Sequence, residues 1–253
     1  MTERAISRIG LKRLAALGGV VALGTVVIMA ANSSAPLAKA ATTDTELSID
    51  LAFGTHLDMD LPEQDVYLER TAGSGEVYRV TKGDHDMGAQ LYRTAEMVKH
   101  DPFNPDAVGP YPKGEALGIT LGEWLRHQGA GSYTCAGGEG RLNTTFSGLV
   151  PHGVYTMWHA FMALTPTTPF TGTLDLPLGA ADGSTSRFVA DANGEAAFTH
   201  TFTPCLQMSD VWTTALLAIA YHSDGKTYGA DPGEWGLNSH MPLFLMLPSR
   251  AGI

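Results

Sequence analysis

Residues Leu149–Ala163 read Leu-Val-Pro-His-Gly-Val-Tyr-Thr-Met-Trp-His-Ala-Phe-Met-Ala. From Val154 onward the side chains are mostly β-branched, aromatic or Met, the types that fill a pleated and buried surface. Alternate positions of a strand form its two faces, and both faces are apolar here, as in a strand covered on both sides. The pattern therefore predicts a central strand. Its ionisable exception, His159, needs a hydrogen-bond partner or a metal, because an unpaired buried imidazole costs roughly 1 to 3 kcal/mol.

Alternating apolar residues and turn signals predict further strands on both sides of this segment. They are expected at Leu47–Phe53, Val66–Arg70, Val77–Thr81, Arg141–Phe146, Gly172–Leu176, Thr185–Ala190, Glu195–Phe202, Ala215–His222 and His240–Leu247. Pro242 places the last strand near a sheet edge. The turns Asp191–Gly194 and Ser223–Lys226 indicate two hairpins, the second returning through Thr227–Gly229.

Two helices and one long loop interrupt the β pattern. Apolar residues recur at helical spacing over Asp86–His100, which predicts a short helix that Pro102 ends. Pro102–Gly114 is rich in proline and is expected to be an extended loop. Thr120 and Glu123 match a capping box and Gly129 a C-terminal stop, so a second helix is expected over 120–129.

About ten strands joined by turns favour one fold class. We expect an antiparallel β-sandwich of Greek-key or jelly-roll type, with one or two short helices and a signal peptide before it.

The N-terminal 40 residues have the features of a signal peptide. Four basic residues precede an apolar run over Leu14–Ala31, and Ala38-Lys39-Ala40 follows as a small-residue cleavage site. We expect export and cleavage, with residues 41–253 as a single secreted domain. The alternative is a retained membrane anchor, since 18 uncharged residues are borderline for crossing a bilayer of about 30 Å.

Charge narrows the classes of partner. Residues 41–253 contain 11 Lys and Arg against 25 Asp and Glu, a net charge of −14. Nucleic acid is therefore not expected as a partner, because phosphate backbones are bound by basic surfaces. No membrane contact is expected after signal cleavage.

Cys135 and Cys205 are the two cysteines of the chain. In an exported protein an even number of cysteines predicts a disulfide, and neither residue has a neighbouring His at ligand spacing. We therefore expect a Cys135–Cys205 bond.

Histidines on several expected strands raise a metal hypothesis. His159, His200, His222 and His240 are the candidates, because imidazoles from neighbouring strands hold copper or zinc in β-sandwiches. The alternative is that each is a hydrogen-bonded histidine at a strand end.

Gly148-Leu-Val-Pro-His-Gly153, followed by His159, resembles a turn and strand of copper-zinc superoxide dismutases and the related chordin-like secreted domains. The resemblance covers Gly148–His159 alone. It implies a Greek-key β-sandwich, and of the His-x-His ligand pair of that family only His159 has a counterpart, since Met157 stands at the other position.

Polar residues near the C-terminus form a candidate binding rim, Asp224, Tyr228 and Trp235, while an Asp-Gly hairpin explains the same residues without a function. No Gly-x-Ser-x-Gly motif is present, so nothing indicates a serine hydrolase. We expect a secreted or extracytoplasmic binding protein without turnover, for an extracellular ligand or partner that the sequence does not name. The alternative is a copper- or zinc-dependent enzyme, and the sequence leaves open whether the protein is an enzyme.

The cleavage site gives a first prediction. N-terminal sequencing of exported protein is expected to start at Ala41, because Ala38 and Ala40 occupy the small-residue positions before the cut. A chain that starts at Met1 and stays in the membrane fraction would contradict it.

Overall fold

The computed structural model describes residues 46–164 and 170–249. In these residues the fold is mainly β, with thirteen strands, one α-helix and two 3-10 helices. All of them belong to a compact unit that spans Thr43–Ile253. The predicted signal peptide and its cleavage site lie outside the described residues. Among the described residues there is no helix with the length and apolar character needed to cross a membrane.

One antiparallel sheet, sheet A, contains β1 (Leu47–Phe53), β6 (Gln128–Ala136), β7 (Glu139–Ser147) and β11 (Ala196–Phe202), in the order β1-β6-β7-β11. Its strand β7 alternates between exposed and buried residues. In β7, Leu142 and Phe146 are buried while Arg141, Asn143 and Thr145 are exposed. One face of sheet A therefore packs on the core and the other is solvated.

The second antiparallel sheet, sheet B, contains β8 (Val154–Ala163), β9 (Leu174–Pro177), β10 (Arg187–Val189), β12 (Thr213–His222) and β13 (Ser239–Met246). β8 pairs with β12 on one side and with β9 and β10 on the other. Its residues 154–160 are all buried, which confirms the predicted central strand. β13 is an edge strand of sheet B, so Pro242 stands where the sequence places it.

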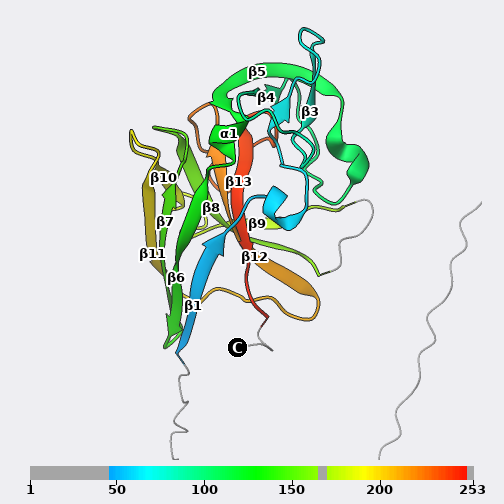
Figure 1. The fold of residues 1–253 in the computed structure, drawn as a ribbon. Coiled ribbons are helices and arrows are strands. Elements are labelled where there is room, and N and C mark those ends of the chain that lie inside the picture. The colour runs from blue at the N-terminus through cyan, green and yellow to red at the C-terminus, as the bar shows by residue number, and fades with distance from the viewer. Residues whose placement is uncertain (1–45, 165–169, 250–253) are drawn as a thin grey trace, which may run out of the picture. The chain divides into compact units, whose positions relative to one another are not determined.

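The two sheets face each other across the main core, and Figure 1 shows them as two layers. Phe188 of β10 stacks on Phe146 of sheet A, with ring centroids 5.4 Å apart, and on Tyr155 of β8 at 5.5 Å. The sandwich prediction is confirmed. Cys135 and Cys205 form the predicted disulfide, with Cα atoms 5.8 Å apart, and such a bond indicates an oxidising compartment.

A small closed barrel was not predicted. β2 (Tyr67–Leu68), β3 (Glu76–Arg79), β4 (Gln90–Thr94) and β5 (Tyr111–Thr120) close in the order β2-β3-β5-β4, and the barrel lies at the upper end in Figure 1. The helix expected at Asp86–His100 is therefore wrong, because Gln90–Thr94 is β4. Tertiary pairing with β2 and β5 overrides the helical spacing there. The expected loop Pro102–Gly114 contains a 3-10 helix, η2 (Pro105–Val108), and the start of β5.

The second expected helix is present but short. The Thr120–Glu123 capping box forms at α1 (Leu121–Trp124). Gly129 does not end it, since β6 begins at Gln128. Gly129 serves the sheet instead, because a Cβ there would lie 2.7 Å from the Phe146 ring.

Both predicted hairpins are wrong in their partners. The turn at Asp191–Gly194 is tight, with Gly194 N donating to Asp191 O at 3.1 Å. However, β10 pairs with β8 of sheet B and β11 with β7 of sheet A, so the turn crosses between the sheets. After β12 no strand forms at Thr227–Gly229, and β12 pairs with β13 beyond a long loop.

The outer face of sheet B is apolar and covered. Ala160, Leu216, Ala218 and Phe244 form a second hydrophobic cluster there, apart from the main core. Met59 and Leu61, at and just after the 3-10 helix η1 (Leu57–Met59), pack against it. Sheet B thus lies between two layers, as the two apolar faces of β8 require.

Trp158 and Trp212 give a matched pair of variants. Trp158 is 2% exposed and donates its indole N–H to Thr156 Oγ1 at 2.7 Å, whereas Trp212 is 80% exposed. Trp158→Ala is expected to lower the free energy of unfolding by about 3 to 5 kcal/mol, and Trp212→Ala by less than about 0.5 kcal/mol. Urea unfolding measures both, and equal stability of the two variants would contradict this packing.

Candidate functional site

An ion pair of Asp65 and Arg79 is buried where the small barrel meets sheet B. Arg79 Nη1 lies 3.0 Å from Asp65 Oδ1, and both side chains are 0% exposed. Arg79 also donates from Nε to Ala107 O at 2.9 Å and from Nη2 to Lys99 O at 2.7 Å. The second carboxylate oxygen of Asp65 accepts from His100 Nδ1 at 2.7 Å. The ion pair therefore fixes both the position and the ring orientation of His100.

The charges of this group follow from its contacts. Burial alone would raise the pKa of Asp65, but His100 and Arg79 outweigh burial and lower this pKa to about 2. Burial also opposes the charge of Arg79, and Asp65 outweighs it, so the pKa of Arg79 is raised. Both residues are therefore ionised at neutral pH.

His56 and Glu63 form a second buried pair of imidazole and carboxyl group. Glu63 Oε2 accepts from the Trp124 indole at 2.9 Å, Glu63 Oε1 accepts from Leu57 N at 3.2 Å, and His56 Nδ1 lies 4.0 Å from Oε2 without a hydrogen-bond partner. Burial raises the pKa of Glu63 to about 7. Burial, followed by repulsion from His100, lowers the pKa of His56 to about 3. His56 is thus neutral at physiological pH, beside a carboxyl group that titrates there.

The rings of His56 and His100 are neighbours, with centroids 6.1 Å apart and planes at 67°. Both line a narrow slot over the outer face of sheet B, which we call the His56–His100 slot. Its free volume is about 40 Å³. Besides the two imidazoles, its lining is thioether, aromatic or aliphatic apart from one threonine: Met162, Met241, Met246, Phe103, Phe170, Phe244, Leu61, Leu216, Pro102 and Thr173.

Two of the predicted candidate histidines lie elsewhere. His159 points to the inner side of sheet B, where its Nε2 donates to Gln207 O at 3.0 Å and its ring packs on Phe161 at 4.4 Å. His200 lies on sheet A, stacked between Phe198 and Phe202 at 6.0 and 5.9 Å. These two side chains therefore belong to different sheets.

The other two candidates, His222 and His240, come close together in a hydrogen-bonded network. His222 Nδ1 contacts Ser239 Oγ at 3.3 Å and Nε2 contacts Thr156 Oγ1 at 2.8 Å. The ring of His240 donates from Nδ1 to Asp65 O and accepts at Nε2 from Ser223 Oγ, 2.9 Å away. Burial lowers the pKa of each to about 4. Both nitrogens of each ring are thus engaged with protein atoms.

The residues of the candidate rim, Asp224, Tyr228 and Trp235, have different contacts in the structure. The Tyr228 hydroxyl donates to Asp224 within the loop after β12. The Trp235 ring instead packs on His100, with centroids 5.1 Å apart. Trp235 therefore contacts His100, although it does not line the slot.

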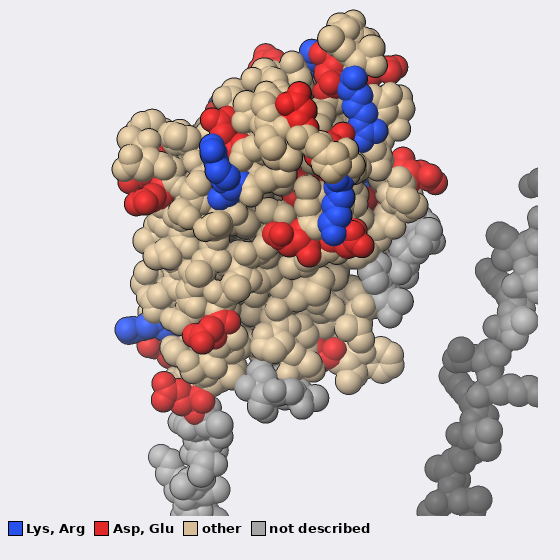
Figure 2. All heavy atoms as spheres, in the orientation of Figure 1, with Lys and Arg blue, Asp and Glu red and all other residues tan. Residues whose placement is uncertain are grey.

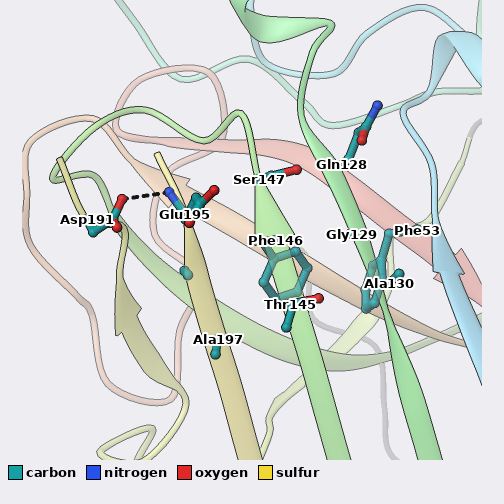
Figure 3. Close-up of a pocket in the computed structure, with 11 residues that line it drawn as sticks. Phe53, Gln128, Gly129, Ala130, Thr145, Phe146, Ser147, Asp191, Glu195 and Ala197 are labelled. Atoms are coloured by element: carbon teal, nitrogen blue, oxygen red, sulfur yellow. Dashed lines mark hydrogen bonds between the residues drawn. The ribbon is translucent and has the colours of Figure 1, made fainter. Parts of the chain in front are cut away.

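A wider hollow lies over sheet A and is shown in Figure 3. Its lining is small and mostly neutral, including Gly129, Ala130, Thr145 and Ala197. Its carboxylate Asp191 accepts from the backbone N–H of Glu195 at 2.9 Å, as part of a turn. On the face in Figure 2 the Lys and Arg side chains lie mainly in the upper half. This hollow has no converging polar groups, so we do not assign it a site.

The residues of the slot were not candidates on sequence grounds. His56, Glu63 and Asp65 are close in the sequence, but Arg79 and His100 lie further along the chain, and the five residues show no ligand spacing. One signal was available: Glu63 and Asp65 follow His56 closely in a chain that contains ten methionines.

Among the described residues no three His, Cys, Asp or Glu side chains are grouped so as to hold a metal ion. The four histidines singled out from the sequence therefore do not share one site. Comparison of the chain with protein-family models, curated proteins and solved structures finds no match in any of the three.

Buried neutral histidines make stability depend on pH. Burial lowers the pKa of His56 to about 3 and those of His127, His222 and His240 to about 4. Unfolded histidines take up protons near pH 6.5, so the unfolded chain binds more protons than the native one between about pH 4 and 6.5. Stability is therefore expected to be full above this range and to fall as the pH falls through it. The raised pKa of Glu63 has the opposite effect on stability between about pH 4.5 and 7. Glu63 is one group, however, and the buried histidines are four.

Urea unfolding at several pH values tests this expectation. His127→Gln should flatten the dependence, because it removes one buried imidazole, and the exposed His85→Gln variant serves as the control. Equal stability at pH 7 and pH 5 would contradict it.

Proposed function

We propose that this protein is exported and binds an ion-sized ligand in the His56–His100 slot without turning it over. Signal cleavage and secretion belong to the proposal, supported by the N-terminal sequence pattern and by the disulfide. The expected partner is the ion-sized ligand itself. Nucleic acid is disfavoured as a partner by the net charge of −14 after residue 40.

The size and lining of the slot carry the proposal. A water molecule occupies roughly 30 Å³ in the liquid, whereas pockets for organic ligands measure roughly 300 to 1,000 Å³. The free volume of about 40 Å³ therefore suits an ion or a molecule of about the size of water. Two imidazoles, each close to a buried carboxyl group, supply the polar end.

A second function, a copper- or zinc-dependent enzyme, is favoured by one contact. A histidine oriented by a carboxylate, as His100 is by Asp65 at 2.7 Å, also suits a general base. The lining favours a binding role over an enzymatic one. Its one hydroxyl group, on Thr173, lies beside Asp175 and bonds to it.

Filling the slot tests the proposal. Leu216 is 5% exposed on the slot floor, so Leu216→Phe fills the free volume. Native mass spectrometry of exported protein, purified without chelators, is expected to show an added small mass on wild type that Leu216→Phe lacks. Ala197→Phe, in the hollow over sheet A, is the matched control and should keep the mass.

Overpacking at Leu216 costs about 1 to 3 kcal/mol, so folding is checked by circular dichroism. Met246→Phe is a second filling variant, because Met246 lines the same slot and is 46% exposed. A wild-type protein without any bound mass would overturn the proposal, as would one whose mass both filling variants retain.

A further inference from the structure

We infer that the ligand of the His56–His100 slot is a cuprous ion, held by the imidazoles of His56 and His100 and by methionine thioethers of the slot. The inference rests on the proposed binding function and names its ligand. It differs from the metal hypothesis drawn from the sequence, because none of the four histidines considered there lines the slot.

The donor atoms of the slot are soft. Its lining has two imidazoles and the thioethers of Met162, Met241 and Met246. Thioether ligands select Cu(I), whereas carboxylates, carbonyls and water suit Mg²⁺ and Ca²⁺. The carboxyl groups of Glu63 and Asp65 are not part of the lining, and the hydroxyl group of Thr173 bonds to Asp175.

The imidazole of His100 is placed as a metal ligand usually is. A metal-bound histidine generally donates its second ring N–H to a carboxylate or carbonyl, which fixes its tautomer. Asp65 Oδ2 holds Nδ1 of His100 at 2.7 Å, and Glu63 Oε2 lies 4.0 Å from Nδ1 of His56. With its ring proton on Nδ1, His100 keeps the Nε2 lone pair for an ion.

His56 and His100 differ from the other close pair of histidines, His222 and His240, because each keeps a ring nitrogen without a protein partner among the described residues. In His222 and His240 both ring nitrogens are engaged with protein atoms. Nδ1 of His56, by contrast, is buried without a hydrogen-bond partner, so protein atoms do not hold both nitrogens of that ring.

The charge of the surroundings suits a monovalent ion. Arg79 already balances the carboxylate of Asp65. Glu63, 4.0 Å from His56 Nδ1, accepts from the Leu57 N–H and the Trp124 indole. One positive ion in the slot would therefore lie near one carboxyl group that no Lys or Arg among the described residues already balances.

The test is an anaerobic titration of purified exported protein with Cu(I), in competition with a chromophoric chelator, and with Ag(I) as a redox-inert probe. We expect one ion of Cu(I) or Ag(I) per chain. The triple variant Met162→Leu, Met241→Leu, Met246→Leu keeps side-chain volume but removes the thioethers, and should weaken binding at least tenfold. His100→Gln should weaken it similarly.

The matched control is the double variant Met157→Leu, Met208→Leu, because both methionines are buried in the main core away from the slot. It should bind both ions as wild type does. Binding of Cu(I) and Ag(I) that the triple Met variant leaves unchanged would overturn the inference, and so would tighter binding of Zn²⁺ than of Cu(I) at the slot.

The two proposals fail in different ways. If wild type carries a slot-bound mass by native mass spectrometry but takes up neither Cu(I) nor Ag(I), the ligand assignment is wrong and the binding function stands. If wild type carries no mass and binds neither ion, both are wrong.

Discussion

The buried ion pair of Arg79 and Asp65 is the interaction on which the arrangement of the slot depends. Three donors of Arg79 reach Asp65, Lys99 O and Ala107 O, so the small barrel and the segment before η2 are tied to one guanidinium. Removing one partner of a buried pair typically costs about 3 to 5 kcal/mol, because the other charge is left uncompensated. Asp65 in turn holds His100 through its carboxylate. Its backbone carbonyl accepts from His240 of β13.

The location of the slot follows from the two apolar faces of sheet B. One face packs on sheet A, and the other needs a cover that the sandwich itself does not provide. The cover includes η1, Leu61 and the segment around His100 and Phe103. Polar side chains of sheet B are satisfied under it, since Trp158 donates to Thr156, which in turn bonds to His222. The small volume of the slot follows from its bulky lining, which includes Phe103, Phe170 and Phe244.

Local patterns were enough to predict the sandwich, because β1, β7 and β8 show their alternation within a few residues and two cysteines allow one pairing. They were not enough for the barrel or the slot. Gln90–Thr94 fits a helical spacing, and only pairing with β2 and β5 makes it a strand. His100 contacts Asp65 across 35 residues and His240 contacts it across 175. Nor does a local pattern predict that Arg79 is 0% exposed, since arginine is mostly exposed.

The two close pairs of histidines show why burial alone does not identify a ligand site. All four rings are shielded from water, and burial lowers the pKa of His56, His222 and His240. Serine and threonine hydroxyls together with a backbone carbonyl occupy the nitrogens of His222 and His240, which makes those rings part of the framework. At His100 a carboxylate orients the ring through Nδ1 without using the other nitrogen, and at His56 the carboxyl group of Glu63 lies 4.0 Å from Nδ1. A histidine whose two ring nitrogens both bond to protein atoms is therefore structural, whereas one that keeps a ring nitrogen free can bind a ligand.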